Sequence, residues 1–141
     1  MDIQFNNLKQ EKGAIGIIFC DHNCRMIGYG KKLDQLSKKY LSNTINADES
    51  FKSRKSKNFD YLIIHSPQNL SFSKLYIFKL KNINNASNRD FQILGGSLLS
   101  IIKFYKEHNV IIYPDGINTS KLSFANSTSE ILLGFLLTSY K

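Results

Sequence analysis

The sequence predicts an α/β fold in which a mixed β-sheet lies between helical layers. Apolar runs of strand length recur along the chain, and the clearest is AIGIIFC at residues 14–20. Segments with apolar residues at helical spacing alternate with these runs. The length of 141 residues suits one domain, predicted to span residues 1–141 and to bury a core of its own.

The first half of the chain predicts two strands and a helix. Residues 3–8 alternate loosely and predict an edge strand, whereas residues 14–20 predict a strand covered on both faces because the run is almost wholly apolar. Residues 31–43 predict a helix, since their apolar face recurs at i, i+3, i+7 and i+8, as Leu33, Leu36, Tyr40 and Leu41. Residues 43–50, NTINADES, predict a turn region.

A β-hairpin is predicted next, joined around Lys57-Asn58. Its first strand, Phe51–Ser56, is polar and is expected at the edge of a sheet. Its second strand, Tyr61–His65, is apolar and is expected to be its buried partner. Pro67 ends the hairpin.

The second half of the chain predicts two more strands around a long helix. The strands are residues 74–80 and 109–114, the latter ended by the turn signal Pro114-Asp115-Gly116. The helix runs to His108 from Ser87, a candidate N-cap. Gly95-Gly96 in its middle indicates either a break or close packing against a neighbour, and we favour close packing.

The last segment, SEILLGFLLTSYK, predicts a helix that begins near the capping-box pair Ser127 and Glu130. Its apolar side chains cover an arc of about 240°, whereas a helix on a sheet needs about 100°. Either two flanking helices cover the extra face, or it contacts another domain or subunit. Leu132, Leu133 and Leu136 are expected to be buried, and the candidate contact residues are Ile131, Phe135, Leu137 and Tyr140.

The charge is a formal +8, from 19 basic and 11 acidic residues, which would suit an anionic partner. Sixteen of the basic residues are lysines, although phosphate recognition favours arginine, so the charge alone is weak evidence. The candidate patch for nucleic acid or another anion is Lys52, Arg54, Lys55 and Lys57. No apolar run is long enough to cross a membrane and the N-terminus does not resemble a signal peptide, so a cytoplasmic location without a membrane partner is predicted.

Motifs that carry chemistry are scarce. Cys20 and Cys24 flank His22 in CDHNC, but a structural zinc site needs four ligands and the remaining histidines are isolated. GYGKK at residues 28–32 precedes a helix and could hold a phosphate, yet it lacks the spacing of a known phosphate loop, so an ordinary turn is favoured. No pair of acidic residues is placed for acid–base work. We therefore predict no catalytic, cofactor-binding or metal-binding residue in this chain.

Several segments in order resemble the N-terminal domain of the cytosolic leucyl aminopeptidases. The corresponding segments are residues 74–82, Leu94-Gly95-Gly96, NVIIYP at residues 109–114, Leu132-Leu133-Gly134 after Glu130, and Tyr140-Lys141. Phe51 and residues 52–55 are similar to the hairpin motif of that family. The glycines that follow the family's strand are replaced here by Lys79-Leu80-Lys81.

The resemblance implies a macro-domain-like, three-layer α/β/α fold without catalytic residues. It also implies a longer polypeptide, in which a separate C-terminal catalytic domain binds two zinc or manganese ions and the subunits form a hexamer. On this hypothesis the chain is an assembly or regulatory domain of an enzyme that removes N-terminal amino acids from peptides. The alternatives are a macro-like module that binds ADP-ribose or nucleic acid, and a standalone protein-interaction domain.

Overall fold

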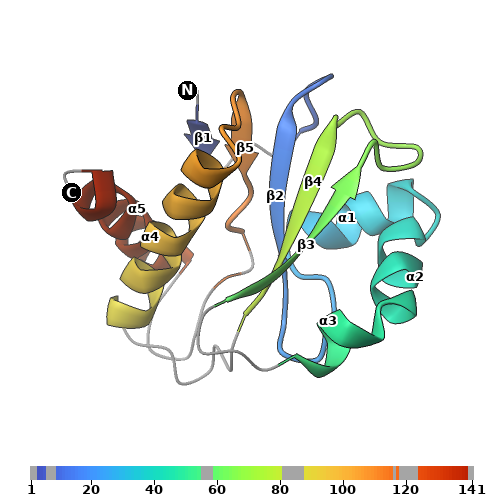
Figure 1. Ribbon diagram of the computed structural model, residues 1–141, viewed down its shortest axis with the longest axis horizontal. Helices are drawn as coiled ribbons and strands as arrows, with labels where there is room; N and C mark the ends of the chain where they lie inside the picture. The colour runs from blue at the N-terminus through green and yellow to red at the C-terminus, as the bar shows by residue number, and fades with distance from the viewer. Residues whose placement is uncertain are drawn as a thin grey trace. The chain divides into compact units, whose positions relative to one another are not determined.

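The computed structural model describes residues 3–5, 9–54, 59–80, 88–115, 117 and 124–139, and the side chains of the last helix over residues 129–136. The chain forms two compact units. Met1–Lys81 with His108–Asp115 carries the sheet and three helices, and Asn82–Glu107 with Gly116–Lys141 carries two helices (Figure 1).

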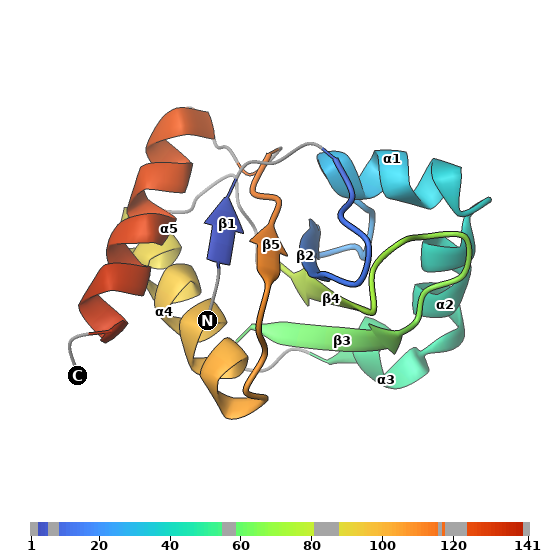
Figure 2. The same ribbon diagram turned by 90° about the horizontal axis from the view of Figure 1, so that it is seen from above.

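Among the described residues, the sheet of the first unit has five strands in the order β1-β5-β2-β4-β3 (Figure 2). β1, β5, β2 and β4 are parallel, whereas β3 is antiparallel to β4. The mixed sheet and the α/β fold class are therefore confirmed. The strands are β1 (Ile3–Phe5), β2 (Ile15–Cys20), β3 (Asp60–His65), β4 (Lys74–Lys79) and β5 (Val110–Ile112).

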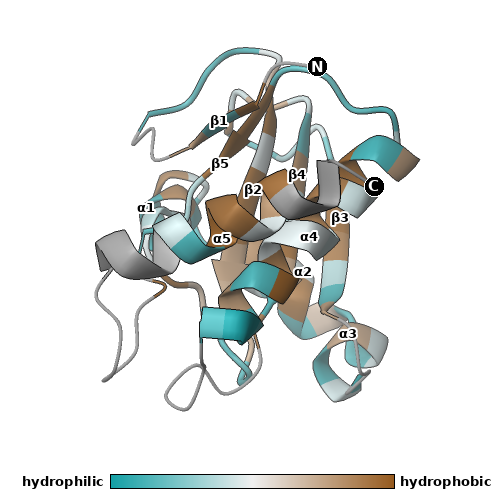
Figure 3. Cartoon of the chain, turned by 90° about the vertical axis from the view of Figure 1, so that its left-hand side faces the viewer, coloured by the Kyte–Doolittle hydropathy of each residue, from teal (hydrophilic) through white to brown (hydrophobic). Residues whose placement is uncertain are grey.

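Strand β2 is central, and all six of its residues are buried. Successive side chains of a strand point to opposite faces, so burial of the whole run means that both faces are covered. This confirms the prediction from the apolar run. In Figure 3 the strands are coloured mostly brown, the colour of hydrophobic residues.

Three helices cover one face of the sheet: α1 (Tyr29–Leu36), α2 (Tyr40–Ala47) and α3 (Glu49–Ser53) (Figures 1 and 2). Leu33, Leu41, Ile45 and Phe51 join Ile18 and Ile77 of the sheet in one buried cluster. The single helix predicted over residues 31–43 is in fact two helices. Lys38 and Lys39 separate them in the left-handed conformation, with φ of 55° and 63°.

Helix α3 corrects two predictions, since residues 43–50 are not a turn region and Phe51–Ser53 is not an edge strand. The Asp48 carboxylate accepts a hydrogen bond from the Phe51 amide at 2.9 Å and so caps the helix. The Phe51 side chain is buried. β3 forms its hairpin with β4 instead, and it lies at the edge of the sheet.

The second unit is a pair of helices, α4 (Asn88–Phe104) and α5 (Phe124–Ser139). α4 runs unbroken through Gly95, because the two helices pack closely there: a Cβ on Gly95 would lie 1.9 Å from the Ile131 carbonyl oxygen. A Cβ on Gly134 would lie 1.8 Å from the Gln92 carbonyl oxygen. Close packing against a neighbour is thus confirmed at Gly95.

Helix α5 forms over the last segment, as predicted, but differs in its start and its buried face. It begins at Phe124, three residues before Ser127, so Ser127 is not its N-cap. Leu132, Leu133 and Leu136 are 42%, 41% and 49% exposed, so their predicted burial was wrong. The apolar arc of this helix therefore does not indicate which of its faces is buried. No helix in the described ranges is long and apolar enough to cross a membrane.

Candidate ligand-binding site

The carboxyl ends of β2 and β5 form the most promising position for a ligand. β2 and β5 are parallel neighbours, and β2 lies between β5 and β4. The chain continues from β2 to β4 on one side of the sheet, whereas β5 inserts on the other side, so the strand order reverses at β2. In open α/β sheets, ligands bind outside the carboxyl ends of the strands at such a reversal.

The loop after β2 is shaped by Asp21 and Gly28. The Asp21 carboxylate accepts hydrogen bonds from the amides of Asn23 and Arg25 at 2.8 and 2.9 Å. Gly28 has φ 57° and ψ −137°, a conformation that only glycine adopts readily, and α1 begins at the next residue. The chain thus turns sharply at Gly28 into the first turn of α1.

Asp115 lies after β5 and meets this turn. A Cβ on Gly28 would lie 1.9 Å from the Asp115 carbonyl oxygen, so the backbones of the two loops are in contact. Burial raises the pKa of the Asp115 carboxyl, while the backbone amides of Asp115 and Tyr29 oppose the shift. Its Oδ1 atom is buried without a hydrogen-bond partner among the described residues. A buried acceptor without a partner is costly, and a ligand donor would satisfy it.

Aromatic side chains lie beside Asp115. The rings of Tyr29 and Tyr113 stack with centroids 4.7 Å apart, and Phe72 contacts Tyr113 edge-on at 6.0 Å. The Tyr113 hydroxyl donates to the Lys9 carbonyl at 2.7 Å. Burial raises the pKa of both tyrosines, so both remain neutral hydroxyls at neutral pH. The site therefore combines an acidic acceptor and a helix N-terminus, next to aromatic side chains that are buried in the core.

The effect of Asp115 on stability should depend on pH. Its folded pKa is raised above the ordinary 3.8, so the folded state binds the proton more tightly. The stability from this group is therefore present at acid pH and lost as the pH rises from about 4 through the raised pKa. In urea unfolding from about pH 4 to 8, Asp115→Asn should gain stability relative to the wild type as the pH rises. A difference that does not change with pH would contradict this.

The two described residues of the predicted anion patch are Lys52, which lies in α3, and Arg54, which caps its C-terminal end, so neither lies on a strand. Lys52 forms an ion pair with Glu49 at 3.3 Å, and Arg54 lies 3.8 Å from the Asp60 carboxylate. Arg54 also donates to the Ser50 hydroxyl at 3.0 Å. Lys55 and Lys57 lie outside the described residues. The two described cations thus have carboxylate partners already, and nucleic-acid binding by this patch stays a prediction.

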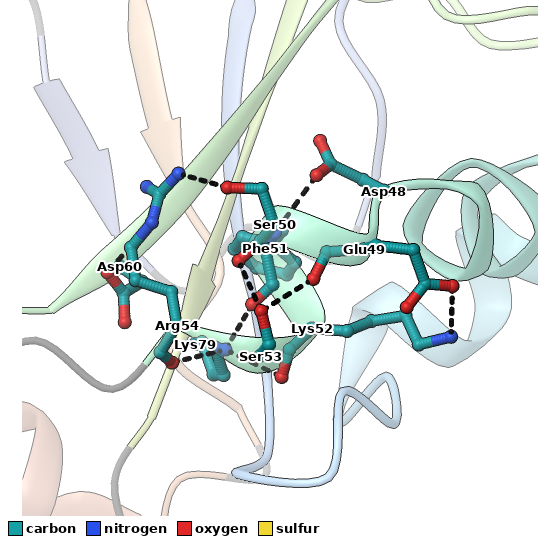
Figure 4. A network of polar contacts seen from close by, with 9 residues as sticks. All are labelled: Asp48, Glu49, Ser50, Phe51, Lys52, Ser53, Arg54, Asp60 and Lys79. Atoms are coloured by element: carbon teal, nitrogen blue, oxygen red, sulfur yellow. Dashed lines mark hydrogen bonds and ion pairs between the residues drawn. The ribbon is translucent and has the colours of Figure 1, made fainter.

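Lys79 is a buried cation for which the sequence analysis predicted no contact, since it was noted only in an apolar strand and in the segment that replaces the family's glycines. It is buried at the carboxyl end of β4, and its ammonium donates to the carbonyl groups of Phe51 and, at 2.9 Å, of Arg54 (Figure 4). The ammonium also lies 4.8 Å from the centre of the Phe51 ring. The ammonium group is thus bonded at the C-terminal end of α3, where the negative end of the helix dipole favours a cation. Lys79 is therefore structural.

The cysteines of CDHNC do not gather further ligands. Cys20 is buried, and burial is the main reason that the pKa of its thiol is raised, with nearby Cys24 raising it further. Within the described part of the chain, no three His, Cys, Asp or Glu residues are grouped to hold a metal ion.

The candidate contact residues of the last helix are only partly described. Ile131 is fully buried and Phe135 is 8% exposed. The side chains of Leu137 and Tyr140 lie outside the described residues. A domain or subunit contact through these four residues stays a prediction, and the exposed side of α5 carries Leu132, Leu133 and Leu136 instead.

Comparison with solved structures identifies the fold. The chain is similar to the macrodomain of Mycobacterium tuberculosis DarG, with a TM-score of 0.65 and 10% identity over 96% of this chain and 91% of that one. It is also similar to a protein of unknown function from Bacteroides thetaiotaomicron, with a TM-score of 0.55 and 10% identity over 99% and 94% of the two chains. No family model and no curated protein sequence matches the chain.

At 10% identity these likenesses concern the fold alone. The chain has an α/β fold with a mixed sheet, and a macrodomain is its structural neighbour. The macro-domain-like part of the predicted resemblance is supported. The aminopeptidase part has no support from these comparisons.

Proposed function

We propose that this chain is a macro-like binding module that takes ADP-ribose, or a closely similar nucleoside diphosphate sugar, at the carboxyl ends of β2 and β5. The observation that carries the proposal is the Asp115 carboxyl, which has a buried oxygen without a partner in the described structure and lies where the strand order reverses. The macrodomain neighbour supports a module of this kind.

The chemistry of the site suits the parts of such a ligand. A carboxylate accepts hydrogen bonds only, so Asp115 would bind an amino group of the base or a hydroxyl group of a ribose. The positive end of the α1 dipole favours the diphosphate. Tyr29 and Tyr113 are buried beside Asp115, and their stacked rings would hold the two loops of the site in place.

Gly28→Ala should abolish most ADP-ribose binding by the full chain in isothermal titration calorimetry. The new methyl group cannot fit beside the Asp115 carbonyl oxygen, so the two loops must separate. Gly13→Ala is the matched control, because Gly13 also has positive φ, 78° against 57°, but its added Cβ would meet nothing within 4 Å. Both glycines have positive φ, so both variants are strained, but only Gly28→Ala also brings the added methyl group against Asp115.

Two results would contradict the proposal. The first is the absence of saturable ADP-ribose binding by the folded wild-type chain. The second is an equal loss of affinity in the Gly28 and Gly13 variants, which would trace the effect to strain rather than to the site.

A second proposal retains the assembly or regulatory domain of a leucyl aminopeptidase, acting in a hexamer beside a catalytic domain with two zinc or manganese ions. The exposed leucines of α5 favour it, since apolar side chains of this kind are typically covered at subunit contacts. On this proposal residues 1–141 have no peptidase activity of their own. Hydrolysis of leucine amides by this chain with zinc or manganese would contradict it.

A further inference from the structure

A polar pocket of about 490 Å³ lies beside the loop that follows β2. Its walls come from that loop and from α1 and α2, and they include Asn23, Arg25, Lys31, Asp34, Lys39 and Ser42. The volume lies in the range of small-molecule sites. The lining contains none of Gly28, Tyr29, Tyr113 and Asp115, so the pocket is separate from the site proposed above.

The pocket has an excess of positive charge. Arg25, Lys31 and Lys39 line it, and none of them forms an ion pair with another described residue. Asp34 is the acidic residue of the lining, but its two oxygens accept hydrogen bonds from the amide and the hydroxyl of Ser42. The Asp34 carboxylate is thereby bonded to the first turn of α2. The side chains of Arg25, Lys31 and Lys39 remain available for a ligand.

The walls of the pocket are fixed by hydrogen-bonded turns. Cys24 and Lys39 both have φ of 63°, a left-handed conformation that is uncommon for residues other than glycine. The Cys24 amide donates to the Asp21 carbonyl at 2.9 Å, and the Lys39 amide donates to the Asp34 carbonyl at 2.7 Å. A pocket whose walls are held before binding loses less entropy when a ligand binds.

We propose that this pocket binds a phosphate-bearing small molecule of mononucleotide size through Arg25, Lys31 and Lys39. The guanidinium group of Arg25 matches two phosphate oxygens, and the lysine ammonium groups add point charges. The amide of Asn23 can donate to or accept from hydroxyl groups of the ligand. This site is independent of the ADP-ribose proposal.

The test uses AMP and inorganic pyrophosphate as probes of the full chain, followed by amide chemical shifts and calorimetry. AMP is expected to bind saturably, to shift amides within residues 23–26 and 31–46, and to bind more tightly than pyrophosphate. Lys39→Asn should weaken AMP binding about tenfold, since it removes one charged contact while asparagine tolerates the left-handed conformation.

Lys38→Asn is the matched control for this variant. Lys38 is also exposed and left-handed, with φ of 55°, but it does not line the pocket. The two variants therefore have the same net charge, and Lys38→Asn should bind AMP like the wild type. Equal weakening in both variants would overturn the proposal, as would the absence of saturable shifts within residues 23–26 and 31–46. Pyrophosphate binding without AMP binding would overturn the assignment to a mononucleotide-sized ligand.

Discussion

Gly95→Ala is expected to destabilise the α4–α5 pair by about 2–3 kcal/mol, despite the better helix propensity of alanine. The added Cβ would lie 1.9 Å from the Ile131 carbonyl oxygen and 3.0 Å from the Phe135 amide nitrogen. Both atoms belong to the backbone of α5, so the contact can be relieved only if the helices move apart. Loss of close packing then removes dispersion contacts along the pair. Urea unfolding followed by circular dichroism measures the change.

Gly30→Ala is the control for this experiment. Gly30 also lies in a helix, but its added Cβ would meet the Cε atom of Met26 at 2.7 Å, the far end of a flexible side chain. That side chain can move, so the cost should be within about 1 kcal/mol. If Gly95→Ala were as stable as Gly30→Ala, the glycine would not be needed for the approach of the two helices.

Lys79→Met should cost about 2–4 kcal/mol of unfolding free energy, because it removes a buried ammonium from carbonyl groups that depend on it. Phe51, Lys52 and Arg54 supply these acceptors at the end of α3. Methionine has a similar shape but cannot donate a hydrogen bond. The unpaired carbonyls and the lost contact with the Phe51 ring should loosen α3, which faster amide exchange over residues 49–53 would report.

Lys32→Met controls for the general effect of removing a lysine, since Lys32 is exposed in α1. It should change the unfolding free energy by at most about 0.5 kcal/mol. Comparable losses in the two variants would show that the bonds of Lys79 to α3 contribute little.

The strands were the most predictable part of the fold. The runs that contain β2, β4 and β5 are apolar, and their burial follows directly from that composition. The prediction failed at α3, where a polar segment was assigned to a strand. Two local contacts decide that region: the Asp48 cap on the Phe51 amide and the bonds of Lys79 to the carbonyl groups. The second joins residues 25 or more positions apart, which no periodicity within α3 could reveal.

The sequence indicated two residues of the candidate site but not that they lie together. Gly28 and Asp115 were both noted, each as part of an ordinary turn. Their contact depends on β2 and β5 being neighbours, which is a property of the strand order and not of either turn. Likewise, the apolar arc of the last helix did not show that Ile131 would be buried while Leu132 would be exposed.

The strand order also bears on how the chain folds as it is synthesised. β5 lies between β1 and β2 in the sheet, yet it is the last of the described strands in the sequence. Ile3 in β1 pairs with Val110. More than a hundred further residues must therefore be synthesised before the described partner of β1 leaves the ribosome. Such distant pairing slows folding and leaves strand edges open in the nascent chain. A chaperone that shields β1 and β2 until β5 arrives would therefore raise the yield of folded protein.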